Sequence, residues 1–533
     1  MTRGGRTAWV IAAYALLAIL VVPVYPHFIS ANEISRWILA VAIVDYHEVE
    51  VTKVINATHT RMEDLSTVDG RIYSNKAPGG ALVGLPAYAI ARAMAGPPSP
   101  HNMRATLDAM RLLGSTVPVI LLALWFAATA RRLGCSEDRV TFAVATMLFG
   151  TPLLAYGLLF FAHALSSFAL FGAFALLFVE VEDKRPRLSG PGQAGAPGQA
   201  GAPVLHLLAG ALIGLAVLTE YPSAIPAAVL IACALPRLRA SGAIRVIAGG
   251  LPFALILGVY NRIAFGSFFT LSSAHESNPV FRNLAGTGLF GIGIPSPVYL
   301  LRLLFDPAKG LFVFSPVLLI AFLGLPAAKR AMPRSAFIAL LATPLSILLT
   351  FSGYPNWDGG WTVGARYLVP AVPYLALLIA FASKTRIEPL LFGASVAVVS
   401  IVSLVFPFVG IDYIAPWVTF SLPILRDGNI VPNFFHLVWR PLAIVVPFVI
   451  VAIAALIAVP RRSVPLAIAG AVLWFAAGFA VARTRKTPSN IRAVVEEAYF
   501  EDRGAIRRAL PPNHPNVPRL EAIARSWMKS PPD

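Results

Sequence analysis

Long apolar runs that alternate with short polar loops account for most of the chain. An α-helix needs about 20 apolar residues to cross the ~30 Å hydrocarbon core of a bilayer, and most of these runs approach that length. The pattern therefore predicts an all-α polytopic membrane protein with about thirteen transmembrane helices. Their expected ranges are 7–24, 113–130, 140–157, 160–179, 204–219, 222–235, 243–260, 311–326, 336–351, 367–383, 389–408, 442–459 and 464–482.

One further apolar segment, 79–95, complicates the alternation of the loops. Six loops between the runs are basic, and arginine and lysine are enriched on the cytoplasmic side of membrane proteins. We therefore expect these six loops in the cytoplasm and the loops 261–310, 352–366 and 409–440 outside. The polar stretch 25–78 shares that outer face only if segment 79–95 makes no net crossing, or if one nearby span is miscounted. The basic loops contain Arg131, Arg132, Arg139, Lys184, Arg185, Arg187, Arg237, Arg239, Arg245, Lys329, Arg330, Arg334, Lys384, Arg386, Arg461 and Arg462.

These patterns divide the chain into four parts. Residues 1–24 form a first transmembrane helix, which we expect to be retained rather than cleaved as a signal peptide, with its N-terminus in the cytoplasm. Residues 25–78 form an extracytoplasmic acidic loop with interfacial helices, and residues 79–482 form the polytopic transmembrane domain. This domain includes a flexible linker rich in Gly, Pro, Ala and Gln at 189–203. Residues 483–533 form a polar tail, which the same count places outside.

Composition agrees with a membrane protein and narrows the classes of function. Hydrophobic residues make up 57% of the chain and charged residues only 13%, with a mean hydropathy of +0.72. The net charge of +17 comes mostly from the basic loops, so it reports topology and no nucleic-acid partner is expected. Cys135 and Cys233 lie far apart, which argues against a disulfide framework or a thiolate metal site. The sequence also lacks the motifs of ATP-driven pumps and zinc proteases.

The stretch 25–78 carries more carboxylates than any other interval between the apolar runs. Glu33 and Asn32 follow the first helix, where a partly shielded carboxylate can act as a general base toward an acceptor hydroxyl. The same residues also suit the first turn of an interfacial helix over 33–44, and the two roles are compatible. Asp64 is the second candidate acid of the loop.

Lys76 directly precedes Ala-Pro-Gly-Gly at the mouth of segment 79–95. A lysine there can hold a phosphate as a point charge, and the glycines allow close approach of the backbone. The alternative is an ordinary lysine whose ammonium group reaches toward the membrane surface.

Two ionisable residues lie near predicted outer ends of apolar runs. His163 falls within LLFFAHALSSFAL, and Glu220 follows LIGLAVLT. Ionisable groups at membrane depth are costly and usually face a cavity or one another, so we expect both to line a substrate cavity. The alternatives are a helix-packing hydrogen bond for His163 and simple interfacial placement for Glu220.

The loop GYPNWDGGWTVGARY at 353–367 suggests a surface for a sugar or a phosphate. Aromatic rings can stack on sugar faces, and arginine binds phosphate oxygens in a bidentate manner. An aromatic belt with an arginine that reaches the interface is the alternative. The candidate residues of this loop are Trp357, Asp358, Trp361 and Arg366.

Seven short strings, together with the layout of the chain, resemble the GT-C superfamily of integral-membrane glycosyltransferases. That superfamily includes protein O-mannosyltransferase-like and aminoarabinose-transferase-like enzymes, and the likeness here is to a bacterial branch over about residues 8–385. The layout is one N-terminal helix, a long acidic outer loop and a dozen short-looped spans. The strings are NEISR, DGRIYSNKAPGG, LLFFAHAL, LTEYPSA, YNRIAFGS, KGLFVFSP and WDGGWTVGARYLVPAVPYL.

The resemblance implies a polyprenyl-phosphate-linked sugar as donor, bound from the membrane. An acid of the first outer loop would activate the acceptor, and basic residues would hold the lipid phosphate. By position the acid is Glu33, with Asp64 next, and the phosphate ligands are Lys76 and Arg366, with Arg36 as a third.

The chain departs from the superfamily at the first acidic position. The superfamily often carries an Asp or a pair of acids there, whereas this chain has Asn32 followed by Glu33. Asp45, Glu48 and Glu50 therefore stay as outside candidates for the base.

The expected function is an inverting sugar transfer to a hydroxyl of a glycan, lipid or protein acceptor on the outer face of a bacterial inner membrane. Carboxylates are plentiful enough for a divalent cation, although no spacing requires one and no metal ligand is assigned. A transporter or lipid flippase would place polar residues at mid-membrane, whereas here they cluster at span ends on one face. A scaffold without activity is the third alternative, in which the acids of the first loop would be interchangeable.

Overall fold

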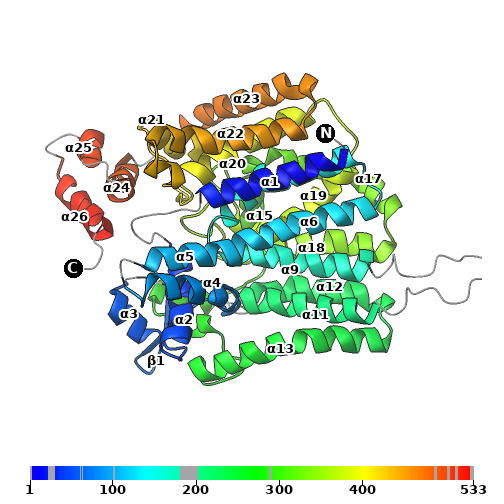
Figure 1. Cartoon of the computed structure of the whole chain (residues 1–533), viewed down its shortest axis with the longest axis horizontal. Helices are drawn as coiled ribbons and strands as arrows, with labels where there is room; N and C mark the ends of the chain where they lie inside the picture. The colour runs from blue at the N-terminus through cyan, green and yellow to red at the C-terminus, as the bar shows by residue number, and fades with distance from the viewer. Residues whose placement is uncertain are drawn as a thin grey trace, which may run out of the picture.

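Long helices run side by side through most of the computed structural model, and shorter helices gather at one end (Figure 1). The structure describes residues 3–21, 30–60, 62, 64–99, 102–180, 202–286, 288, 291–484, 489–500, 504–510 and 514–528. The predicted linker 189–203 lies outside the described residues, apart from its last two positions.

The described residues contain one short β-hairpin, and nearly all other regular structure is helical. The strands are β1 (Leu65–Val68) and β2 (Arg71–Ser74). The α-helices are α1 (Arg3–Val21), α2 (Ala31–Asp45), α3 (Thr52–Thr58), α4 (Gly79–Ala95), α5 (Met103–Arg111), α6 (Val117–Arg132), α7 (Glu137–Phe149), α8 (Leu153–Tyr156), α9 (Ala162–Ala175), α11 (Ala202–Thr219), α12 (Ala224–Ala234), α13 (Ala240–Phe265), α14 (Pro279–Ala285), α15 (Pro297–Phe305), α16 (Leu311–Phe314), α17 (Ala321–Ala331), α18 (Arg334–Ser352), α19 (Val372–Phe381), α20 (Glu388–Val405), α21 (Leu422–Arg426), α22 (Arg440–Ala458), α23 (Val464–Ala482), α24 (Ser489–Tyr499), α25 (Ala505–Ala509) and α26 (Val517–Met528).

Seven helices among the described residues are long and apolar enough to cross a membrane. They are Met103–Arg132, Ala162–Glu180, Ala240–Phe265, Arg334–Ser352, Glu388–Val405, Arg440–Ala458 and Arg461–Ala482. Shorter apolar helices cover Gly5–Val21, Gly79–Ala95, Pro203–Thr219, Tyr221–Arg237 and Arg366–Phe381. Each predicted span coincides with helix, although 140–157 and 311–326 are broken into shorter pieces. The chain is an all-α multi-pass membrane protein, as the hydrophobic pattern predicts.

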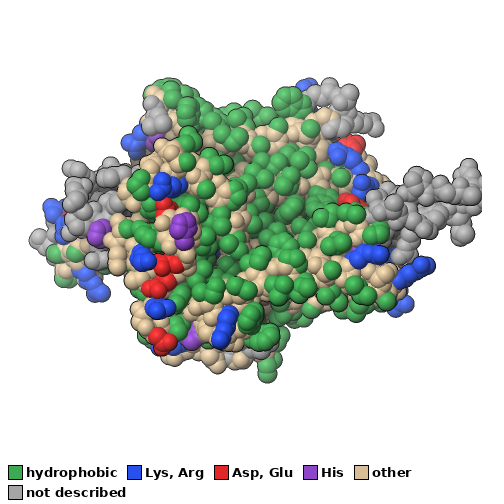
Figure 2. Space-filling model, turned by 60° about the horizontal axis from the view of Figure 1, so that its bottom comes forward, with side chains coloured by type: hydrophobic (Ala, Val, Ile, Leu, Met, Phe, Trp, Pro, Cys, Tyr) green, Lys and Arg blue, Asp and Glu red, His purple; other side chains and the backbone are tan. Residues whose placement is uncertain are grey.

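The helices pack through small residues and turn apolar side chains outward. A Cβ atom added at Gly210 of α11 would lie 1.9 Å from the carbonyl oxygen of Val246 in α13, so only glycine permits this approach. The outward side of α13 exposes large apolar side chains such as Ile244 and Ile247. Figure 2 shows apolar side chains across the middle of one face, with charged side chains gathered toward its two ends. This distribution suits a bundle surrounded by lipid.

One end of the bundle, which we call the basic end, joins the start of α1 to the basic loops. Arg6 pairs with Asp138 at 3.1 Å, and Lys384 pairs with the same carboxylate at 2.9 Å. Arg139 pairs with Glu388 at 2.7 Å close by. Loops that are distant in sequence therefore share one end, as expected from their common charge.

The opposite end, which we call the loop end, gathers the first loop and the predicted outer loops. In the first loop, α2 covers the predicted interfacial helix 33–44, and β1 and β2 pair through a turn at Asp69 and Gly70. Both turn residues have positive φ, of 50° and 79°, as a two-residue type I′ turn requires. Lys309 ties its own outer segment to two others, because its side-chain nitrogen donates to carbonyl oxygens of Gly360, Thr362 and Val409 at 2.6–2.8 Å.

Segment 79–95, which forms α4, begins and ends near the loop end. A Cβ added at Gly79 would lie 2.7 Å from the backbone of Leu218 and Thr219, at the outer end of α11. Arg92, near the other end of α4, pairs with Asp45 of α2 at 2.7 Å. The chain then continues through α5 into the helix that ends at Arg132, and α4 itself stays near the loop end (Figure 1), which favours the alternative in which 79–95 makes no net crossing. This arrangement satisfies the alternation of basic loops.

The polar tail also lies at the loop end, where α24, α25 and α26 stand beside the bundle (Figure 1). Phe406 contacts the rings of Tyr499 and Phe500, with ring centroids 5.7 and 5.8 Å away. The tail is therefore packed against the loop that follows α20.

Candidate functional site

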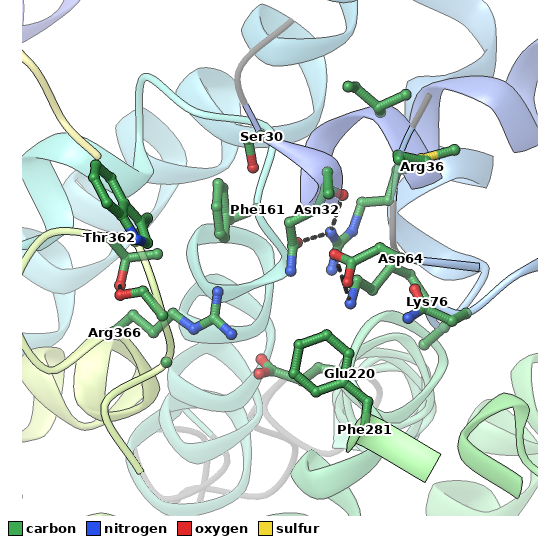
Figure 3. A pocket seen from close by; sticks show the side chains of 18 of the residues that line it. Ser30, Asn32, Arg36, Asp64, Lys76, Phe161, Glu220, Phe281, Thr362 and Arg366 are labelled. Atoms are coloured by element: carbon green, nitrogen blue, oxygen red, sulfur yellow. Dashed lines mark hydrogen bonds and ion pairs between the residues drawn. The ribbon is translucent and has the colours of Figure 1, made fainter. Parts of the chain in front are cut away.

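A cavity of about 2280 Å³ opens at the loop end, between the first loop and the outer loops. Its walls come from α2, the hairpin region, the start of α9, the α11–α12 junction, the segment after α13, the loop before α19 and the tail. Figure 3 shows side chains from these elements that point into one central space. Seven predicted site residues line the cavity: Arg36, Asp64, Lys76, His163, Glu220, Trp361 and Arg366.

Arg36 projects from α2 into the cavity and is 5% exposed. Its guanidinium group donates to the backbone and side-chain oxygens of Asn32, one helical turn earlier. The Nε atom has no hydrogen-bond partner, and no carboxylate of the described residues forms an ion pair with Arg36. Burial lowers the pKa of Arg36 to about 10, so the group stays charged at neutral pH. It is thus a buried cation without a countercharge in direct contact.

Arg366 reaches the same space from the opposite wall, at the start of the short helix Arg366–Ala371 (Figure 3). It donates to the Tyr367 hydroxyl at 3.0 Å and lies over the rings of Tyr367 and Phe161, 4.8 and 5.8 Å from their centroids. Its Nε atom also lacks a partner, and no described carboxylate lies within ion-pair distance. Aromatic rings hold this guanidinium in place and leave its charge available.

Asp64 and Lys76 form an ion pair on the cavity wall, with 3.1 Å between the Lys76 ammonium and a carboxylate oxygen. Asp64 precedes β1 and Lys76 follows β2, so the hairpin brings the two residues together. Burial raises the pKa of Asp64, but the charges of Lys76, Arg366 and Arg36 outweigh it, so the pKa lies below its ordinary value. Asp64 is therefore an ionised carboxylate at neutral pH.

His163 and Glu220 form a second polar pair in the cavity. His163 Nδ1 lies 3.1 Å from one carboxylate oxygen of Glu220 and 3.3 Å from the other. The two residues come from the start of α9 and the junction of α11 with α12. Both predicted cavity residues thus face each other, as costly groups at membrane depth usually do.

Glu33, the acid that the sequence favours as base, does not line the cavity. It is 1% exposed, and both its oxygens accept hydrogen bonds of 2.8 Å from Arg111 of α5. The backbone N–H of Phe160 donates to the same carboxylate at 2.7 Å. With these bonds Glu33 joins α2 to α5 and to the segment before α9.

The three outside candidates for the base also lie away from the cavity lining. Asp45 accepts hydrogen bonds from Tyr88 and Arg92. Glu48 pairs with Lys53 at 3.2 Å, and Glu50 accepts a hydrogen bond from Thr52. Each of these acids helps to hold the fold of the first loop.

In the aromatic loop 353–367, Trp357 and Asp358 make structural contacts, whereas Trp361 lines the cavity. Trp357 is 4% exposed, stacks on Tyr299 and lies under the guanidinium of Arg302. Asp358 accepts a hydrogen bond from the Gly360 N–H at 3.0 Å, which shapes the turn. Neither side chain lines the cavity, whereas Trp361 does and is 40% exposed.

Several lining residues carried no clear sequence signal. Asn75 and Glu276 lie on the wall beside Lys76, and Tyr499 and Arg525 of the tail contribute to the rim. Asn75 falls within the string DGRIYSNKAPGG and Glu276 within the predicted outer loop 261–310, and these are the hints that the sequence offers. Within the described parts of the chain, no group of three or more His, Cys, Asp and Glu residues is arranged to hold a metal ion.

Comparison with known proteins relates the fold to solved membrane transferases. No family model and no curated protein sequence matches the chain. ArnT from Cupriavidus metallidurans bound to undecaprenyl phosphate matches with a TM-score of 0.52 and 18% identity, over 89% of this chain and 76% of that one. Its apo structure matches with a TM-score of 0.50 and 17% identity, over 90% and 76%. The oligosaccharyltransferase of Archaeoglobus fulgidus gives a TM-score of 0.46 and 12% identity, over 99% and 59%.

The ArnT likeness extends over most of both chains. The chain therefore shares the fold of ArnT.

Proposed function

We propose that the chain is a membrane glycosyltransferase that moves a sugar from a polyprenyl-phosphate donor to an acceptor hydroxyl. The observation that carries this proposal is the pair of buried guanidinium groups, Arg36 and Arg366, that face one cavity without an ion-pair partner among the described carboxylates. Asp64 acts on both guanidinium groups without contacting either, so an anion that binds between them directly would stabilise these buried charges. A phosphate group matches the charge and the fork geometry of arginine.

An apolar groove beside the cavity supports a lipid as the carrier of that phosphate. The groove measures about 570 Å³ and lies between α11, α12 and α13, with Phe253 and Phe268 among its mostly apolar lining residues. Val217 and Leu257 line both the groove and the cavity, so the two spaces meet at these side chains. A prenyl chain in the groove would bring its phosphate directly to the cavity. ArnT, whose fold the chain shares, was crystallised with undecaprenyl phosphate.

The basic residues and the carboxylate that line the cavity suggest how the transfer would occur. The acceptor oxygen attacks the anomeric carbon as the bond from that carbon to the phosphate oxygen breaks, which inverts the configuration. The electron pair leaves with polyprenyl phosphate, and Arg36, Arg366 and Lys76 would stabilise the charge that develops there. Asp64 would accept the hydroxyl hydrogen, because it is an ionised carboxylate on the same wall.

The reaction would take place on the outer face of a bacterial inner membrane. The six basic loops favour the cytoplasmic side for the basic end, which leaves the cavity and the first loop outside. Trp361 and the His163–Glu220 pair would contact the transferred sugar or the acceptor, which is a glycan, a lipid or a protein. A divalent cation is not required by this arrangement of charges.

The test measures whether the added protein transfers labelled sugar from a polyprenyl-phosphate-linked donor to acceptors in membranes that otherwise lack the protein. Loss of a charge-assisted hydrogen bond costs about 1.5–3 kcal/mol, so Arg36→Ala and Arg366→Ala should each lower the rate about 10- to 150-fold. Arg71→Ala is the matched control, since this arginine is exposed and outside the cavity lining. Full activity of both cavity variants, or uptake of a soluble substrate into proteoliposomes without any transfer, would contradict the proposal.

A further inference from the structure

Glu276 lies in the cavity on a segment that is fastened to the hairpin of the first loop. The N–H of Ser277 donates to the carbonyl of Leu65 at 2.8 Å, and Glu276 forms a β-bridge with Ser66. The hydroxyl of Ser272 donates to the carbonyl of Asn75 at 2.7 Å. These bonds hold Glu276 against the wall that carries Asp64 and Lys76, about 200 residues earlier in the chain.

The carboxylate of Glu276 is held by an amide and not by a cation. Asn75 Nδ2 lies 3.1 and 2.9 Å from its two oxygens, and the residue is 9% exposed. No described lysine, arginine or histidine lies within ion-pair distance of it. Such a site tolerates both the charged and the protonated form, because a neutral amide does not fix a negative charge as strongly as an ammonium group does.

The groups around Glu276 determine its pKa. Burial raises its pKa to about 7, while Asn75 and Lys76 lower it and Asp64 raises it. From other elements, Arg282 of α14 donates to the backbone carbonyl of Glu276, and Tyr354 faces the same space. His275, the preceding residue, stacks on Phe265.

Asp64 binds a proton less readily than Glu276 does, because its pKa is lower. Asp64 is paired with Lys76 at 3.1 Å, and this pairing holds its pKa below the ordinary value. A carboxylate of this kind can orient a hydroxyl and draw its hydrogen, but it is a weak final acceptor. The transfer releases one proton for every sugar moved when polyprenyl phosphate leaves as the dianion, its main form above about pH 6, so a better acceptor beside Asp64 would complete the reaction.

We propose that Glu276 is the second carboxylate of the site and the group on which the acceptor's proton comes to rest. This inference rests on the proposed glycosyl transfer. The acceptor O–H bond breaks as the bond from oxygen to the anomeric carbon forms, and the proton passes through Asp64 to Glu276. The electron pair of the broken sugar–phosphate bond leaves with polyprenyl phosphate. Asp64 returns to its ionised form, and Glu276 loses the proton to water that enters the cavity.

A purely structural role for Glu276 predicts different results from a proton-accepting role. If Glu276 only pins its loop to Asn75, then Glu276→Gln, which keeps an oxygen for that amide, should preserve the rate. If Glu276 accepts the proton, Glu276→Gln should lower the transfer rate about 100-fold or more, since general-base groups contribute about 10²- to 10⁴-fold. Binding of polyprenyl phosphate should be unchanged in this variant, because the phosphate lies between Arg36 and Arg366.

The pH profile separates the two roles further. The wild-type rate should rise with pH through about 7, as Glu276 becomes ionised and able to accept a proton. Asn75→Ala removes a hydrogen bond that lowers the pKa of Glu276, so the rising limb should move to higher pH. In Glu276→Gln the limb should disappear. Glu50→Gln is the matched control, since this acid lies outside the cavity lining.

The experiment measures transfer of labelled sugar from the polyprenyl-phosphate-linked donor between pH 5 and 9, with thermal unfolding and polyprenyl-phosphate binding recorded for each variant. A folded Glu276→Gln variant with wild-type rate and wild-type pH profile would overturn the role of Glu276, while wild-type transfer would still support the proposed function. Absence of transfer by the wild-type protein with several lipid-linked sugars would overturn the proposed function and this inference with it.

Discussion

Glu33 and Arg111, which lines the cavity, form a bidentate ion pair with two hydrogen bonds of 2.8 Å between side chains that are almost completely buried. The pair links α2 of the first loop to α5, which continues toward the first long membrane helix of the bundle. Glu33, the acid nearest the expected catalytic position in the sequence, therefore helps to hold α2, the helix that carries Arg36 and Asn32.

This pairing predicts that Glu33 variants fail by unfolding and not by loss of chemistry. Removal of one partner from a buried ion pair costs about 3–5 kcal/mol, and Arg111 would keep only Asp108, at 2.9 Å, as a partner. Glu33→Ala should lower the melting temperature strongly, whereas Glu33→Gln, which keeps an acceptor for Arg111 and for the Phe160 N–H, should lower it less. Thermal unfolding in detergent measures both effects. A stable Glu33→Ala protein without transfer activity would instead return the base to Glu33.

The junction of the groove with the cavity predicts a dependence on the length of the lipid. Val217→Trp should fill the passage that Val217 and Leu257 share, and each displaced CH₂ group forfeits about 0.8 kcal/mol of burial. The KM for a long-chain donor should rise about 10-fold, while a donor with a short prenyl chain should be affected little. Leu251→Trp, on the exposed side of α13, is the control. Equal effects on both donors would argue against a prenyl chain in this groove.

The hydrogen bonds of Lys309, which lies outside the cavity lining, predict that this residue helps to position Arg366. Its ammonium group is 1% exposed and donates to the carbonyls of Gly360, Thr362 and Val409. Lys309→Met leaves three acceptors unsatisfied, which should cost about 3 kcal/mol or more. The loop from Gly360 to Arg366 should loosen, so the KM for the donor should rise more than kcat falls. Unfolding and steady-state kinetics measure this, and unchanged values for both would refute the role of Lys309.

The ion pair between Asp64 and Lys76 predicts how stability changes with pH. The pKa of Asp64 is lowered in the folded state, so its contribution is present above the pKa of the unfolded chain, about 3.9, and is lost as pH falls through the lower folded value. The difference in melting temperature between wild type and Asp64→Asn should therefore stay constant from pH 7 to 5 and shrink only below about 4. A difference that fades already between pH 7 and 5 would mean that Asp64 is not held ionised.

The hydrophobic pattern was sufficient to predict the membrane helices and their common polar end. Apolar length defines a span and arginine or lysine content defines its side, and both are local properties of the sequence. The same counting left two alternatives for segment 79–95, no net crossing or a miscounted span nearby, and the contacts of Gly79 and Arg92 favour the first. Boundaries failed where the chain bends, as at 311–326, where α16, a 3-10 turn and α17 replace one expected helix.

Partners of the charged side chains could not be predicted in this way. Glu33 and Arg111 are 78 positions apart, and Asn75 and Glu276 are 201 positions apart. A single sequence indicates that such groups share a face of the membrane, but the packing of the helices decides which acid meets which base. For this reason the partner of Glu33 could not be predicted, and Glu276 could be assigned only to the outer loop 261–310, without a role.

The central claim is that Arg36 and Arg366 hold one phosphate between them, and a structure of the protein with undecaprenyl phosphate tests it most directly. We predict density for the phosphate in contact with both guanidinium groups and density for the prenyl chain past Val217 into the groove between α11, α12 and α13. A phosphate bound elsewhere, with either arginine facing solvent in the occupied protein, would contradict the account.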